Sequence, residues 1–117
     1  GKVTHHLCKD GDYTHVLRFK AELGLTDDQI NAINDQKFEY NKTRIRTKAD
    51  LEIARMELNR LLHAAIINEA KIRELADSIG DIKKGKVKNK VEAKLRLLQI
   101  LTGEQSAKIN KMYRTHQ

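Results

Sequence analysis

The feature that most constrains this chain is a ten-residue phrase that occurs twice. It reads LTDDQINAIN from Leu25 and LTGEQSAKIN from Leu101, so Leu, Thr, Gln, Ile and Asn recur in register. In each copy a Thr is followed three residues later by a Gln, which is the capping-box pattern that begins an α-helix. Two helix starts are therefore predicted, and the residues that carry them are Leu25, Thr26, Gln29, Leu101, Thr102 and Gln105.

Between the two phrases, apolar residues spaced three or four apart predict long helices over 26–65 and 68–100. A short helix over 13–24 precedes the first phrase and another follows the second, so four helices are predicted in the order short–long–long–short. At 1.5 Å per residue, the long pair forms an antiparallel hairpin roughly 50–60 Å long. The hairpin returns the second phrase to the first, where we expect Leu101 to pack near Leu25.

Two stretches weaken this pattern. Only Ile45 is strongly apolar over 39–50, so the first long helix is expected to bend or to be largely solvated there. Gly80 and Gly85 each weaken a helix by ~1 kcal/mol relative to Ala. We expect the second long helix to continue through both glycines, with a break as the alternative.

The composition fits an all-α protein with apolar stripes. The chain has 117 residues, no proline and 33% charged residues, which suits long helices better than a thick core. A domain this thin buries little surface, so we expect a homodimer. No stretch approaches the ~18 apolar residues of a membrane span. Residues 1–12 are polar and aperiodic, and they predict a flexible N-terminal arm before a domain over 13–117.

Leu-Thr-x-x-Gln on both sides of a charged helical hairpin resembles the LTxxQ family of bacterial envelope proteins. The overall pattern covers residues 14 to 116, nearly the whole chain. The resemblance implies a four-helix α-hairpin that dimerises into a curved cradle in the periplasm. It also implies two alternative functions, because the family contains stress proteins of the Spy and CpxP type and heavy-metal resistance and sensor proteins.

Metal binding requires His, Cys, Asp, Glu or Met side chains that converge from separate segments. The family's sensors carry a His-x-x-x-His pair before the first motif and a His-x-x-x-Met pair before the second. The matching positions here hold four residues that are not plausible ligands, namely Val16, Lys20, Ala93 and Leu97. Four other residues near the N-terminus are candidate ligands for zinc, nickel or copper, with ordinary tail residues as the alternative: His5, His6, Cys8 and His15.

The single cysteine, Cys8, excludes an intramolecular disulfide. It is either an inert thiol or, in an oxidising compartment, half of an interchain disulfide across a dimer.

The formal net charge of +7 favours acidic partners. Residues 81–97 contain seven basic and two acidic side chains, and a second basic cluster lies at 42–48. A chaperone that works without ATP needs cations to attract client chains and scattered apolar side chains to hold them. The candidate basic surface consists of Lys42, Arg44, Arg46, Lys48, Lys83, Lys84, Lys86, Lys88 and Lys90. A solvated helix face is the alternative, and the sequence leaves open whether the two clusters face each other.

Other classes of function are less favoured. Only 4% of the residues are aromatic and no helix-turn-helix spacing is evident, so we expect no nucleic-acid partner. No Gly-rich phosphate loop, nucleophile elbow or HExxH motif occurs, so we expect no enzyme. The sequence thus predicts a periplasmic envelope-stress protein, which binds unfolded or acidic proteins or the periplasmic domain of a sensor kinase. A metal-binding resistance or sensor protein is the alternative.

Overall fold

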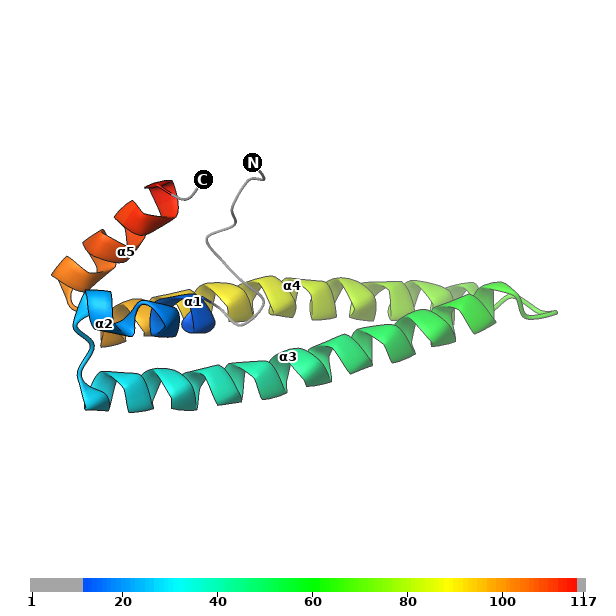
Figure 1. Cartoon of the computed structure of the whole chain (residues 1–117). Coiled ribbons are helices and arrows are strands. Elements are labelled where there is room, and N and C mark those ends of the chain that lie inside the picture. Colours follow the sequence, from blue (N-terminus) through cyan, green and yellow to red (C-terminus); the bar gives the residue numbers. More distant parts are fainter. Residues whose placement is uncertain (1–11, 116–117) are drawn as a thin grey trace. The chain divides into compact units, whose positions relative to one another are not determined.

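A computed structural model describes residues 12–115 of the chain. Within this range the protein contains five α-helices and no strand, which confirms the all-α prediction. The helices are α1 (Tyr13–Arg18), α2 (Lys20–Leu23), α3 (Asp27–Leu62), α4 (Glu69–Ile100) and α5 (Gly103–Thr115) (Figure 1). The long helices α3 and α4 pack against each other as a helical hairpin. None of the helices within 12–115 combines the length and the apolar composition of a membrane span.

The short first helix is divided, which raises the number of helices from the predicted four to five. The break falls at Phe19, whose backbone N–H donates to the Val16 carbonyl oxygen at 3.1 Å instead of continuing the α-helical pattern. The second piece, α2, ends at Gly24 in the left-handed conformation, with φ at 66°. Glycine reaches this conformation without the steric cost of a Cβ atom, which is why it so often follows a helix.

The chain divides into two compact units. Of the described residues, unit 1 comprises 12–41 and 90–115, and unit 2 comprises Lys42–Asn89. Both α3 and α4 pass through the boundary without interruption (Figure 1). Each unit is therefore built on parts of the same two helices.

Unit 1 has a core to which all five helices contribute. Its buried residues are Tyr13, Val16, Leu23, Ile33, Ala93, Leu97, Leu101, Ile109 and Tyr113. Leu25 packs against this cluster, so both motif leucines belong to one core, as predicted for the two corners. The Tyr13 hydroxyl also lies 3.2 Å from Gln36 Oε1 and 3.3 Å from the Ala93 carbonyl oxygen, which connects α1 to both long helices.

Unit 2 is a simple pair of antiparallel helices with a small core. Its buried residues are Leu51, Ala54 and Ile79, and the partly buried residues packed against them are Leu58, Leu75 and Ile82. The spacing along the two helices matches a register in which Leu51 faces Ile82, Ala54 faces Ile79 and Leu58 faces Leu75. In this register, the numbers of any two residues that face each other across the pair add to 133, which gives the facing position for every other residue of unit 2.

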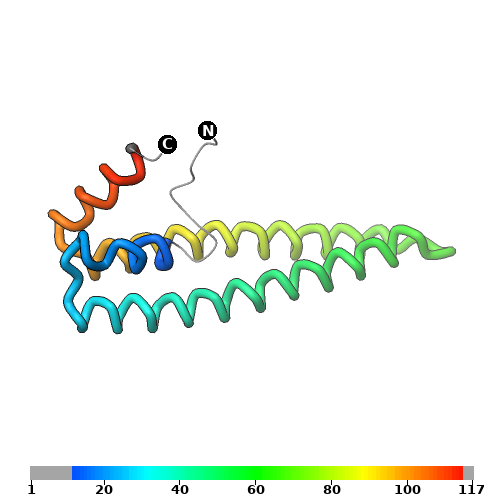
Figure 2. Tube along the Cα trace, viewed as in Figure 1, coloured from blue at the N-terminus to red at the C-terminus, as the bar shows by residue number. Residues whose placement is uncertain are grey.

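The hairpin turns at residues 63–68, between the ends of α3 and α4 (Figure 2). The first long helix therefore stops at Leu62, three residues before the predicted end at 65. The second begins where the sequence predicts, because Asn68 Oδ1 accepts a hydrogen bond from the Lys71 backbone N–H at 3.1 Å and caps the helix.

The weak stretches of the sequence remain helical. Gly80 and Gly85 lie inside an unbroken α4, so the continuous helix is the correct alternative. No residue over 34–50 or over 80–92 is buried. The middle of each long helix thus has no fully buried side chain, although Tyr40 and Ile82 are partly buried against the two cores.

Candidate functional site

Both predicted capping boxes are formed in unit 1. Thr26 Oγ1 accepts a hydrogen bond from the Gln29 backbone N–H at 3.1 Å, and the Thr26 N–H donates to Gln29 Oε1 at 2.9 Å. Thr102 and Gln105 repeat this arrangement with the same two distances, 3.1 and 2.9 Å. Each box satisfies two backbone donors at the start of its helix, so the repeated phrase begins α3 and α5 by the same chemistry.

The two motif glutamines also contact each other. Gln29 Nε2 lies 2.8 Å from Gln105 Oε1, and Gln105 Nε2 lies 3.3 Å from Gln29 Oε1. Gln29 donates further to the carbonyl oxygen of Ile100 at 3.0 Å, and Gln105 donates to that of Leu23 at 3.2 Å. Each glutamine thus caps the start of its own helix and holds the end of the helix that precedes the other motif.

This reciprocal pattern explains why the phrase occurs twice. The sequence predicts the capping boxes, because they depend on residues three apart. It does not predict the bond between the glutamines, which are 76 residues apart and meet only because the hairpin returns. The only feature of the sequence that points to this contact is the presence of two capping boxes, one on each side of a predicted hairpin. The motif residues form a structural lock whose polar atoms are used within the protein.

The N-terminal metal candidates are only partly placed. His5, His6 and Cys8 lie outside the described residues. His15 is half-buried on α1, where its ring stacks on Tyr113 with centroids 4.5 Å apart and meets Phe19 edge-on at 5.1 Å. Aromatic packing therefore accounts for the position of His15. Within residues 12–115, no group of three or more His, Cys, Asp or Glu side chains could hold a metal ion.

The positions that match the sensor ligands of the LTxxQ family lie mostly in the core of unit 1. Val16, Ala93 and Leu97 have exposed fractions of 1%, 2% and 1% and belong to one apolar cluster. Lys20 is exposed at the start of α2. Apolar packing thus accounts for three of these four positions.

A buried ion pair joins α4 to the residue before α1. Asp12 is fully buried, and its Oδ2 lies 3.1 Å from Lys94 Nζ, whose side chain is 20% exposed. The same ammonium lies 5.4 Å from the ring centroid of Tyr113 on α5, within the range of a cation–π contact. Asp12, the last residue of the predicted arm, is therefore held by the core of unit 1.

Eight of the nine predicted basic residues lie in unit 2, where we call them the basic belt. They are Lys42, Arg44, Arg46, Lys48, Lys83, Lys84, Lys86 and Lys88, and Lys90 follows as the first residue of the α4 stretch in unit 1. The register of unit 2 places 44–48 beside 85–89, so the two clusters lie at the same level of the helix pair. No acidic residue occurs over 42–49 or 82–89, and Asp50 and Asp81 mark the edge of the belt.

The belt surrounds the helix pair and does not form one face. On α3, Lys42 and Arg46 share one side, and Arg44 and Lys48 lie about 200° around the helix from them. On α4, the consecutive Lys83 and Lys84 point about 100° apart. The cations of unit 2 therefore do not form a single face of the helix pair.

Six cations of the belt are exposed and thus accessible, while Lys42 and Arg44 are half-buried. Two exposed aliphatic residues lie among them. Ile45 is 61% exposed between Arg44 and Arg46, and Val87 is 62% exposed between Lys86 and Lys88. The register places these two residues within one position of the same level. The belt thus combines a high density of positive charge with aliphatic surface.

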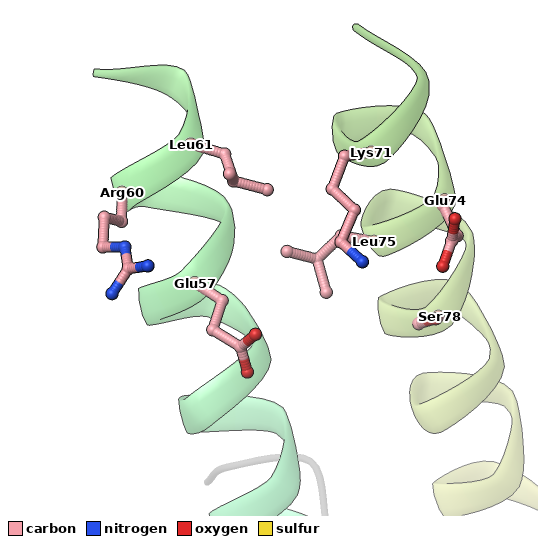
Figure 3. Close-up of a pocket in the computed structure, with 7 residues that line it drawn as sticks. All are labelled: Glu57, Arg60, Leu61, Lys71, Glu74, Leu75 and Ser78. Atoms are coloured by element: carbon pink, nitrogen blue, oxygen red, sulfur yellow. The ribbon is translucent and has the colours of Figure 1, made fainter. Parts of the chain in front are cut away.

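The turn end of unit 2 has a different character. A groove of about 350 Å³ lies between the helices, lined by Glu57, Arg60, Leu61, Lys71, Glu74, Leu75 and Ser78. Figure 3 shows Leu61 and Leu75 pointing toward each other across it. Over 50–81 there are four basic and seven acidic residues, so the net positive charge of unit 2 comes from the belt.

Comparisons of the chain with protein-family models, with curated proteins and with solved structures found no match.

Proposed function

We propose that this protein is a periplasmic envelope-stress protein of the LTxxQ type, which binds unfolded or acidic proteins through the basic belt without ATP and without covalent chemistry. The observation that carries the proposal is the belt. Eight cations with no acid among them surround a stretch of helix pair in which no residue is buried. Long-range attraction from such a surface raises the rate at which acidic chains are captured.

The repeated motif supports the placement in the LTxxQ family. The resemblance rests on six residues, and four of them form two matched capping boxes joined through Gln29 and Gln105. The periplasmic location follows only from this resemblance. Cell fractionation of the full-length native protein tests it, and recovery in the cytoplasm would contradict the assignment.

Self-association is part of the proposal. Ile53 and Met56 on α3 have exposed fractions of 54% and 72%, and apolar side chains of this kind gain from burial in a homodimer. Sedimentation of the protein over a range of concentrations tests this. A monomer at every concentration would remove the dimer from the proposal.

Suppression of aggregation tests the chaperone activity. An acidic client is denatured and diluted into buffer with or without the protein, and light scattering is followed at low and at physiological salt. Changing Lys83, Lys84, Lys86 and Lys88 to Glu should abolish the protection. Changing Arg55, Arg60, Lys71 and Arg73 to Glu is the matched control, because these four residues are exposed, lie in unit 2 and change the net charge equally. Equal protection by both variants would contradict a role for the belt.

The same belt could present the protein to the periplasmic domain of a sensor kinase, the second kind of partner that the resemblance implies. Binding of such a domain, and its loss in the belt variant but not in the control, distinguishes this role from general protection of clients.

The metal-binding alternative depends on His5, His6 and Cys8, since His15 packs among aromatic side chains. Calorimetric titration with zinc, nickel and copper separates it from the chaperone function. Under the chaperone proposal we expect no stoichiometric binding tighter than micromolar. Tight binding that is lost on changing the two histidines and the cysteine to Ser would favour the metal function.

A further inference from the structure

The two stretches that carry the basic belt, 42–49 and 82–89, contain eight basic residues and no acidic residue. Along each helix, like charges lie four residues apart at Lys42 and Arg46, at Arg44 and Lys48, and at Lys84 and Lys88. Like charges at this spacing repel each other and destabilise a helix. Within residues 12–115, no ion pair involves any of the six accessible cations of the belt. An external anion would therefore gain attraction and also relieve repulsion.

The directions of the cations favour a flexible linear partner. Because the cations point to all sides of the helix pair, a flat membrane or a rigid helix would meet only some of them. A flexible chain can pass around the pair and meet all six exposed cations. The perimeter of two packed helices is roughly 50–60 Å, which an extended polypeptide of about 16–18 residues spans.

The aliphatic residues of the belt favour a polypeptide over other polyanions. Ile45 and Val87 expose more than half of their surface among the cations, at nearly the same level of the hairpin. Polyphosphate has no apolar groups to cover them. Single-stranded nucleic acid is bound through aromatic side chains that stack on the bases, and neither 42–49 nor 82–89 contains an aromatic residue.

We infer that the basic belt binds a disordered acidic polypeptide segment that wraps around the helix pair and carries aliphatic side chains among its carboxylates. This inference rests on the proposed function and names the class of client segment for its surface. The carboxylates contact the belt cations, and the aliphatic side chains cover Ile45 and Val87. The segment binds in an extended conformation.

The probe is a fluorescently labelled peptide of about 20 residues in which pairs of Glu alternate with single Leu residues. Anisotropy measures its binding to the full chain. The same peptide with Ser in place of Leu, polyphosphate and oligothymidine of equal charge, and vesicles with anionic lipid compete in separate titrations. We expect the Glu–Leu peptide to bind at least tenfold more tightly than each competitor at physiological salt. Tighter binding of polyphosphate, oligothymidine or vesicles, or equal binding of the Ser peptide, would overturn the inference.

Variants locate the site. Changing Lys83, Lys84, Lys86 and Lys88 to Gln should weaken peptide binding at least tenfold, and changing Arg55, Arg60, Lys71 and Arg73 to Gln should change it less than twofold. Ile45→Gln with Val87→Gln should weaken binding about fivefold. Ile66→Gln is its control, because Ile66 is 86% exposed outside the belt. Glutamine forms helices nearly as well as lysine, so the variants should keep their helical circular dichroism.

The two proposals can fail separately. If the Gln variant of the belt loses the peptide but still suppresses aggregation, the inference stands and the belt is not the chaperone surface. If it binds the peptide normally but no longer suppresses aggregation, the inference is wrong and the proposed function survives.

Discussion

Unit 1 and unit 2 are built on the same two helices, yet they are stabilised in different ways. Unit 1 buries nine apolar residues, adds an ion pair at Asp12 and joins its corners through two glutamines. Unit 2 buries three, and eight of its twelve basic residues are gathered in the belt. The free energy of folding is therefore concentrated in unit 1.

The comparison indicates how a small chain can keep a solvated binding surface. Regions with few buried apolar contacts open at lower free energy than the core to which they are joined. Because unit 1 fixes the start of α3 and the end of α4, the middle of both helices can consist of charged and solvated residues. Four sets of substitutions test this division, in order of decreasing expected effect.

Leu97→Ala should have the largest effect. Leu97 is 1% exposed in the core of unit 1, and emptying such a site costs about 3–4 kcal/mol in the free energy of unfolding. Ile79→Ala in unit 2 should cost about 2 kcal/mol, since Ile79 is 9% exposed and its smaller cluster can relax. Urea unfolding of both variants measures the difference. A larger loss for Ile79→Ala would reverse the comparison.

Asp12→Ala removes one partner of the buried ion pair and leaves Lys94 without its carboxylate. We expect a loss of about 2–3 kcal/mol, less than for a fully buried pair, because the Lys94 side chain is 20% exposed. Thermal unfolding checks this, with Asp10→Ala as the control outside the described residues. An unchanged midpoint would show that the ion pair does not stabilise unit 1.

Gln105→Ala should cost about 2 kcal/mol, because it leaves the Thr102 N–H and the Leu23 carbonyl without their partner. Gln29→Ala should cost less, since Gln29 is only half-buried. The double variant should lose less than the sum of the single losses, because the two side chains bond to each other. Strict additivity in a double-mutant cycle would argue that the capping boxes act independently.

Gly80→Ala and Gly85→Ala should stabilise unit 2 by about 0.5–1 kcal/mol each. Both glycines lie inside α4, and a Cβ atom at either position would meet nothing within 4 Å. Amide hydrogen exchange over 82–89 should slow, whereas that over 93–100 should not change. Destabilisation by either substitution would mean that the glycine serves a contact other than helix continuity.

Features that depend on residues close together in the sequence could be predicted, whereas features that depend on distant residues could not. Helix starts at Thr26, Asn68 and Thr102 depend on neighbours three residues away, and the sequence predicts them. The break at Phe19 has no such local signal, and the early end at Leu62 changes a boundary by one turn. The glutamine pair depends on a contact across 76 residues, which no local pattern contains.

The relative placement of the two basic clusters also could not be predicted from local sequence. Composition identifies both clusters, but only the register of Leu51, Ala54 and Ile79 places them at one level. Helical periodicity of 100° per residue was available from the sequence and already spreads Lys83, Lys84, Lys86 and Lys88 around α4. The spread of these four lysines around their helix therefore follows from the sequence alone.

The hydrogen bonds between Gln29 and Gln105 join the two motifs by contacts that do not depend on the length of the hairpin between them. Every group that this lock uses lies within a few residues of one of the two motifs, and none lies in unit 2. Removing seven residues from α3 and seven from α4 would shorten the hairpin by about two turns and keep the same sides facing each other. The contact between the motifs and the length of the hairpin are thus specified by separate parts of the sequence. A protein with a shorter or longer hairpin can therefore be made without changing the residues of the two motifs.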